Sequence, residues 1–353
     1  MMRLDLYLAK HVLSATLAVL LVIAGLDTLF ALVDQLPDLR HGYALVDAMQ
    51  YVGLTVPHRL YEFIPMSALI GCLLGLGALA SSSELTVMRA AGVSVSRIVM
   101  GVMKPVLLLV VMAVALGEWV VPEAEQKAES FRSLKLSGNR ALAVHGVWHR
   151  DGNDFIHINA VIEGGTLHGV TRYQFDTNNR LIRASFAREG YYQESGGWRL
   201  VDVQETRFEE NRTASQLVKE EIWQVELTPS LLSVIVVEPV NLSMQGLWQY
   251  SDYLLRQGLK PDTYLLAFWN KALMPLSILA LVLVAVSFIF GPLRSVTVGQ
   301  RLIAGIIMGV VFKLAQDMLG PASTVFGFNP VIAVMVPIAV CAVAGGWLLK
   351  RAG

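Results

Sequence analysis

The segment VLSATLAVLLVIAGLDTLFALVDQL, residues 12–36, is long and apolar, and it decides the class of fold. A helix of about 25 residues, rising about 1.5 Å per residue, is long enough to cross a hydrocarbon layer of about 30 Å. Five further segments of this kind follow, at Leu60–Ala80, Ile98–Val121, Leu265–Phe290, Leu302–Leu319 and Val331–Leu349. The sequence therefore predicts a polytopic α-helical membrane protein with six transmembrane helices.

The composition supports a membrane location and excludes other classes. Hydrophobic residues make up 54% of the chain and charged residues 16%, with a mean hydropathy of +0.54, which is too apolar for an ordinary soluble domain of this size. The formal net charge is zero, so nothing points to a nucleic-acid partner. Cys72 and Cys341 lie inside predicted spans, so the sequence offers neither a disulfide framework nor a thiolate zinc site.

Lysine and arginine residues collect on one side of the predicted spans. Near the span ends, the side that holds both termini carries Arg3, Lys10, Arg89, Arg97, Lys104, Arg294, Arg301, Lys350 and Arg351. The short loops of the other side carry only Arg40 and Arg59. By the positive-inside rule both termini are expected in the cytoplasm. The long insertion between spans three and four then lies outside, which in a bacterial inner membrane is the periplasm.

The expected domains are residues 1–121 with spans one to three, residues 122–261 as the insertion, and residues 262–353 with spans four to six. Alternating strand-like segments in the insertion run over Ala141–His149, Phe155–Ala160, Val170–Phe175, Leu181–Arg188, Trp198–Gln204 and Ile222–Leu227. Many short strands at this spacing favour an antiparallel sandwich, jelly roll or open barrel. Helices are expected at both ends, at Glu123–Leu136 and from a cap at Ser243 to Gly258.

The loop SSSELTVMRAAGVSVSR between spans two and three predicts a short helix. Ser81 and Glu84 have the spacing of a capping box, and Gly92 can end the helix before Ser94 or Ser96 starts the next. Such a helix either transmits movement from a cytosolic partner or merely connects two spans, and its spacing leaves both possibilities open.

Several segments together resemble the lipopolysaccharide-export permeases of the LptF/LptG family, and its LptG branch in particular. They are PMSALIGCLLGLGALA with SELTVMRAAG, GEWVVPEAEQ, GVWHRDGNDFIHI and SFIFGPLRSV, and they follow in the family's order over essentially the whole chain. In this family the short helix, at about residues 82–92, is the coupling helix that docks into the ATP-binding subunit. The contact candidates that the resemblance implies are Glu84, Leu85, Val87, Met88, Arg89 and Gly92.

Energy for transport must come from another protein, because the chain has no GxxxxGK[ST] phosphate loop. The resemblance implies a cytosolic ATPase dimer, LptB, which binds ATP and Mg, together with the sister permease LptF. LptC and LptA would receive lipopolysaccharide on the periplasmic side. The chain itself is expected to bind no cofactor and to act as a transport subunit, not as an enzyme.

Metal chemistry is not indicated by the sequence. His145, His149, His157 and His168 lie in strand-like sequence without carboxylate or thiol partners at ligand spacing. These histidines are therefore interpreted as surface or sheet-packing residues.

Ionisable residues inside the spans are costly in hydrocarbon, so they are expected to face a cavity, a partner helix or one another. Asp27 and Asp34 share a helix face, and Lys313 and Asp317 are four residues apart and can pair. Pairing that fixes helix packing and direct substrate contact both remain open. Lys271 is another such group, and it can alternatively snorkel to the external boundary.

A substrate with acyl chains and anionic phosphosugars needs an apolar cavity rimmed by cations. The predicted phosphate or sugar contacts are Arg40, Arg59, Arg132 and Lys135. Relatives tend to carry basic residues near the outer end of span one, where this chain has Ala31, Pro37 and Asp38. Electrostatic capture is therefore left to Arg40 or to the sister subunit.

The resemblance implies that spans one and five form lateral gates against the sister permease. Gly25, Gly305 and Gly309 would permit close helix approach there, and the last two have GxxxG spacing. In the β domain, the candidates for an interior that shelters acyl chains, or simply packs a closed core, are Phe155, Ile158, Phe186, Tyr192 and Trp198.

The resulting hypothesis is that lipopolysaccharide enters laterally between the two permeases and is expelled upward when ATP binding closes the ATPase. Two other functions are compatible with the sequence. One is a membrane-anchored periplasmic scaffold of envelope assembly, and the other is an ion-coupled lipid carrier that uses the charges inside the spans. The two membrane halves show no visible inverted similarity, which disfavours the carrier.

Overall fold

The computed structural model describes residues 2–39, 43–137, 147–162, 166–193, 197–209, 212–225, 228, 238–256, 259–291 and 296–352. Six of its helices are long and apolar enough to cross a membrane, which confirms the six predicted spans. They are α1 (Met2–Asp34), α2 (Leu45–Ser81), α4 (Val95–Ala115), α8 (Asp262–Phe290), α9 (Val298–Phe326) and α10 (Pro330–Ala352). Shorter helical pieces in the described residues include η1 (Leu36–Asp38), α3 (Glu84–Ala90), η3 (Pro239–Asn241) and α7 (Met244–Arg256).

Span three does not end where its apolar residues end. Helix α4 passes through one π-helical turn, Leu116–Val120, and continues as α5 (Val121–Ser137), which was predicted as a continuation of the span. Helix α1 begins ten residues before the predicted Val12. Its first turn tolerates Asp5 because Arg97 and Lys104 bind this carboxylate at 2.8 and 2.6 Å.

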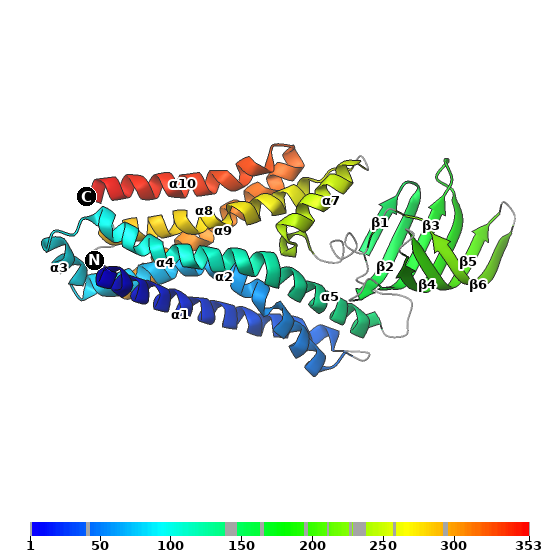
Figure 1. The fold of residues 1–353 in the computed structure, drawn as a ribbon, viewed down its shortest axis with the longest axis horizontal. Coiled ribbons are helices and arrows are strands. Elements are labelled where there is room, and N and C mark those ends of the chain that lie inside the picture. The colour runs from blue at the N-terminus through cyan, green and yellow to red at the C-terminus, as the bar shows by residue number, and fades with distance from the viewer. Residues whose placement is uncertain are drawn as a thin grey trace. The chain divides into compact units, whose positions relative to one another are not determined.

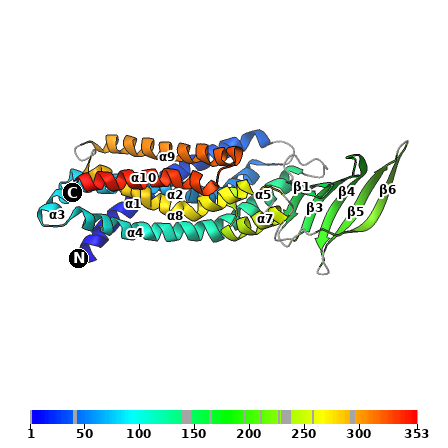
Figure 2. The same ribbon diagram turned by 90° about the horizontal axis from the view of Figure 1, so that it is seen from above.

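The chain divides into two compact units. The helical unit comprises residues 1–30, 56–121 and 243–353, and the sheet unit comprises residues 31–55 and 122–242. Within the helical unit, α3 and both ends of the chain lie at the same end of the helices (Figure 1). Figure 2 shows α9 and α4 on opposite sides of this unit, with α8 between them.

Helices α2 and α8 carry the core of the helical unit. In their most apolar windows, 67% and 61% of the residues are buried, against 17% in both α1 and α9. Fully buried side chains include Leu69, Leu73 and Leu76 of α2 and Ile278 and Val282 of α8. Helices α1 and α9 therefore turn most of their apolar surface away from this chain.

Helix α7 forms as the sequence predicts. Ser243 Oγ accepts a hydrogen bond from the backbone N–H of Gly246 at 3.0 Å, which caps the first turn. Leu247, Tyr250 and Leu254 are buried along one face. The predicted stop at Gly258 lies outside the described residues.

Six antiparallel strands form one sheet in sequential order, which confirms an inserted antiparallel β domain. The strands are β1 (Val147–Asp151), β2 (Asp154–Ile162), β3 (Thr166–Phe175), β4 (Leu181–Tyr192), β5 (Trp198–Phe208) and β6 (Thr213–Trp223). The predicted strand at 222–227 is misplaced, because β6 starts nine residues earlier. Most of β6 is polar and exposed, so it lacks the apolar alternation by which strands are recognised.

The regular pairing of the sheet is interrupted along a line that crosses five strands. Regular pairing passes over Asn159, Gly169, Arg188, Asp202 and Lys219, which lie opposite one another in β2 to β6. Gly169 has φ +64° and Asp202 has φ +54°, and a Cβ at Gly169 would lie 2.2 Å from the Asn159 side chain. Along a strand, the residues that face the sheet core have even numbers on one side of this line and odd numbers on the other.

The core of the sheet unit lies on one face. Its buried members include Ile156, Ile158, Leu167, Val170, Leu200, Val203 and Trp223. Of the predicted interior residues, Ile158 and Trp198 are buried, whereas Phe155 and Tyr192 are 39% exposed and Phe186 is half-buried. Phe155 alternates with Ile156 along β2, so its ring lies on the opposite face, against Phe175.

Candidate functional site

The loop between spans two and three forms the predicted helix α3, but not by the predicted cap. Ser81 still belongs to α2, and its hydroxyl donates to the Gly77 carbonyl at 2.9 Å. Ser83 precedes α3 in the left-handed region, with φ +62° and no side-chain cap. The capping box between Ser81 and Glu84 is therefore wrong. Gly92, at φ +87°, follows the helix as predicted.

The two faces of α3 have different roles. Leu85 is 4% exposed and lies in the core of the helical unit, with Met88 packed against that core. Val87, in contrast, is 65% exposed. The structure therefore removes Leu85 from the candidate contact surface and leaves Val87 on it. Arg89 is half-buried, and Gly92 is exposed.

Glu84 is bound to the first span. Its carboxylate accepts hydrogen bonds from the hydroxyl of Tyr7 at 2.7 Å and from Ser82 Oγ at 2.9 Å. These two bonds, the one from Tyr7 being the larger cause, hold the pKa of Glu84 below its usual value. The first turn of α3 is thus tied to α1.

A matching connection ties the start of α9 to the end of α2. Arg301 is 2% exposed, and its guanidinium donates to the Gly77 carbonyl at 2.5 Å and to Ser81 Oγ at 2.9 Å. A Cβ on Gly77 would lie 2.9 Å from the Arg301 side chain, so the guanidinium depends on that glycine. The sequence placed Arg301 only among the cytoplasmic charges, because nothing local indicates a partner 224 residues away.

Two glycine seams hold α1 and α9 against α2. Gly305 approaches Leu73 and Ile70, and Gly309 approaches Met66, so the predicted close contact of α9 is made with α2 of the same chain. A second GxxxG pair, Gly71 and Gly75, faces Thr16 and His11 of α1. Sequence reasoning missed this pair, although its spacing is visible in GCLLG. An added Cβ on Gly25 would meet nothing within 4 Å in the described structure.

The charges inside the spans form interhelical pairs. Asp27 of α1 binds Arg59 of α2, two residues that the sequence had assigned to different roles. Lys313 of α9 binds Glu62 of α2 at 3.1 Å as well as Asp317 at 3.5 Å. The sequence predicted the contact between Lys313 and Asp317 and missed Glu62. Asp34 is exposed on α1.

Lys271 is buried in the helical unit and does not snorkel. Its Nζ donates to the carbonyl of Gly117 at 2.7 Å, inside the π-helical turn of span three, and lies 5.7 Å from the centre of the Tyr61 ring. A Cβ on Gly117 would lie 2.4 Å from that ring. The lysine thus supports an irregular turn whose carbonyl would otherwise face a low-dielectric core.

The predicted phosphate contacts of the sheet unit are bound to carboxylates. Arg132 binds Asp38 at 2.7 Å and lies over the ring of Tyr51 at 5.2 Å, and Lys135 binds Asp47 at 2.9 Å. Arg40, the remaining predicted contact beyond Arg59, lies outside the described residues. A substrate phosphate at Arg132 or Lys135 has to replace a carboxylate.

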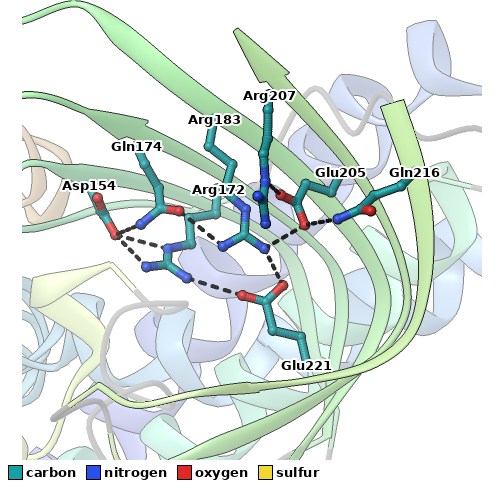
Figure 3. A network of polar contacts seen from close by, with 8 residues as sticks. All are labelled: Asp154, Arg172, Gln174, Arg183, Glu205, Arg207, Gln216 and Glu221. Carbon is teal, nitrogen blue, oxygen red and sulfur yellow. Dashed lines mark hydrogen bonds and ion pairs between the residues drawn. The ribbon is translucent and has the colours of Figure 1, made fainter. Parts of the chain in front are cut away.

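Polar side chains fill the other part of the sheet's core face (Figure 3). Arg183 binds Glu205 at 3.0 Å and Glu221 at 2.6 Å, while Arg172 binds Asp154 at 2.7 Å. The network also includes Gln174, Arg207 and Gln216. Burial by itself raises the pKa of Glu205, but hydrogen bonds from Arg207 and Gln216 and the charge of Arg183 outweigh it and lower that pKa.

Metal ligands do not gather in the described residues, where no three His, Cys, Asp or Glu side chains stand close enough to hold an ion. Cys72 and Cys341 are buried and free.

Six apolar spans, an inserted antiparallel sheet and paired charges between spans define a multi-pass membrane protein. The chain belongs to the family of lipopolysaccharide export system permeases LptF/LptG, whose pattern matches residues 6–351. It is 38% identical over 353 residues to the lipopolysaccharide export system permease protein LptG of Escherichia coli K12, covering 99% of this chain and 98% of the relative. It is 36% identical over 351 residues to LptG of Haemophilus influenzae, with the same coverage.

Proposed function

We propose that this chain is a transmembrane subunit of an ABC transporter that extracts lipopolysaccharide from the outer leaflet of the inner membrane and passes it to a periplasmic bridge. The partners are the sister permease LptF, the cytosolic ATPase dimer LptB with its ATP and Mg, and LptC and LptA on the periplasmic side. Both termini lie in the cytoplasm, and the sheet unit lies in the periplasm. The family membership and the resemblance of the whole chain support this assignment.

The observation that carries the proposal is the two-faced helix α3. It lies at the same end of the helical unit as both termini, is anchored by Leu85 and Glu84, and presents Val87 outward. An exposed valine on an anchored helix is suited to docking into a groove of another protein. The chain has no phosphate-loop motif of its own, so a separate ATPase is the natural occupant of that face.

Movement of α3 has a direct route to both proposed gates. The bond between Tyr7 and Glu84 connects α3 to α1, and Arg301 connects the end of α2 to the start of α9. Helices α1 and α9 are also the least buried spans, which leaves their apolar faces for the sister permease or for lipid. Closure of the ATPase would thus move α1 and α9 against the sister permease's helices and narrow the cavity between the two subunits.

Phosphate capture is assigned to Arg132 and Lys135, together with Arg40, which follows span one in the sequence. Guanidinium and ammonium groups exchange one anionic oxygen partner for another at little net cost. Asp38 and Asp47 would hold these cations in place until a phosphosugar replaces them. The pairs formed by Asp27 with Arg59 and by Lys313 with Glu62 fix helix packing in this proposal and do not carry substrate.

The test separates docking from the internal contacts of α3. Val87→Arg places a charge on the exposed face without touching a hydrogen bond, so we expect at least a tenfold loss of co-purifying ATPase and of lipopolysaccharide release. Val298→Arg, at a 51% exposed valine at the start of α9, is the matched control and should retain the complex. Intact complex formation and release with Val87→Arg would refute the docking face and favour a periplasmic scaffold.

A further inference from the structure

A pocket opens at the end of the helical unit that holds α3. It has a volume of about 710 Å³ and is lined by the end of α3, the first turns of α4 and the end of α10. The polar part of its lining consists of Arg89, Ser94, Ser96 and Lys350. The apolar part consists of Val93, Val95, Val99, Met100 and Leu349.

The charge of the lining favours an anion. Among the described residues that line the pocket none is acidic, and the described parts of the chain provide no ion-pair partner for Arg89 or Lys350. Two other cations at this end, Arg97 and Lys104, are already bound to Asp5. Two like charges beside one cavity at a low-dielectric border are stabilised by an anion between them.

Hydroxyl and backbone groups add to the anionic preference. The Oγ atoms of Ser94 and Ser96 lie 3.1 Å apart, and Ser94 caps α4, a helix of 21 residues. The N-terminus of a long helix carries partial positive charge and free N–H donors. These groups lie beside the two cations in the same cavity.

The apolar half of the lining decides between a free anion and an amphiphile. Helix α4 begins its membrane span at Val95, and the span of α10 ends at Arg351, so the pocket stands at the border of the hydrocarbon layer. Met100 is 55% exposed one turn into α4. A ligand with a phosphate beside an acyl chain satisfies both halves, and basic pockets between spans at this level suit anionic lipid headgroups.

We propose that this pocket binds one anionic phospholipid, with its phosphate between Arg89 and Lys350 and the start of an acyl chain along Met100 and Leu349. The lipid would fill the space between the ends of α3 and α10 and hold the end of α3 against the membrane surface. The inference does not require the transport function, because the chain alone carries every lining residue.

The test uses the purified chain in vesicles of phosphatidylcholine that contain phosphatidylglycerol as the probe. After mild detergent extraction, the retained lipid is counted by native mass spectrometry. We expect the wild type to retain phosphatidylglycerol selectively and each alanine substitution, Arg89→Ala or Lys350→Ala, to lower retention about fivefold. Arg351→Ala is the matched control, because Arg351 lies next in sequence over the Trp347 ring, outside the pocket lining, and should change nothing.

Met100→Trp provides a second variant that fills the pocket without removing a charge, and it too should lower retention. Equal retention by the wild type and by both kinds of variant would overturn the proposal. Displacement of the probe by inorganic phosphate alone, with no preference for lipid, would overturn it in favour of a free-anion site. If Lys350→Ala leaves lipid retention unchanged but loses the co-purifying ATPase, the proposal is also overturned. The pocket would then belong to the interface with the protein partner.

Discussion

Gly71→Ala is the substitution that tests most directly how α1 is held to α2. An added Cβ at this position would lie 2.3 Å from Thr16 Cα and 2.6 Å from its backbone nitrogen, where ordinary contact begins at 3.4 Å. Backbone atoms cannot rotate away as a flexible side chain can, so α1 has to retreat by about 1 Å.

The cost follows from the contacts that the seam would lose. A gap of about 1 Å forfeits up to roughly half of the dispersion energy of each facing atom pair. Overpacking of this kind costs about 1–3 kcal/mol, and the better helix propensity of alanine returns up to about 1 kcal/mol. We therefore expect a net loss of about 1 to 2 kcal/mol in the free energy of unfolding.

Titration of the purified protein from mild detergent into sodium dodecyl sulfate, followed by tryptophan fluorescence, measures this loss. Gly25→Ala is the matched control, because Gly25 lies in the partner helix α1 and an added Cβ there would meet nothing within 4 Å, so the substitution should be neutral or slightly stabilising. Should the two variants unfold at the same detergent fraction, α1 does not rest on α2 at Thr16 and the seam is not a structural contact.

Two further outcomes are expected. Arg301→Ala removes a buried donor from the Gly77 carbonyl and Ser81 Oγ. It should lower the free energy of unfolding by about 2–3 kcal/mol in the same titration. A loss below about 0.5 kcal/mol would show that the guanidinium is dispensable there. Glu205→Gln should destabilise the protein at neutral pH. The folded pKa of Glu205 lies below its ordinary value of 4.5. The extra stability of the wild type should therefore be present above pH 4.5 and disappear as the pH falls through the folded pKa. A constant difference between wild type and Glu205→Gln from neutral to acidic pH would contradict this assignment.

Local patterns gave the spans and most strands, because both depend on neighbours in sequence. The six apolar segments needed only length, and β2 to β5 needed only alternation. Strand β6 was not recognised over most of its length, because Gln216 and Glu221 face the ion-paired part of the core. Polar residues at these positions remove the apolar half of the alternating pattern. The interruption of pairing across the sheet was equally hidden in β5, where Asp202 and not a glycine adopts the left-handed conformation.

The candidate site was predicted less well than the fold. Its residues were recognised as unusual, but their partners come from other helices. Asp27 was recognised only as sharing a helix face with Asp34, whereas its cation is Arg59 on the next span. Ser81 was interpreted as a cap for the following helix, whereas it receives a hydrogen bond from Arg301. A single sequence gives the chemistry of such groups and not the distances between spans.

Helix α2 contacts both α1 and α9 through residues of one continuous stretch. Arg59, Gly71 and Gly75 meet α1, and Glu62 and Gly77 meet side chains of α9, all within about five turns. Inserting or deleting one residue anywhere in that stretch would rotate everything beyond it by about 100° and break register with both neighbours at once. Loops of this chain can change in length without disturbing these contacts, whereas the stretch of α2 from Arg59 to Gly77 has to keep its residue count.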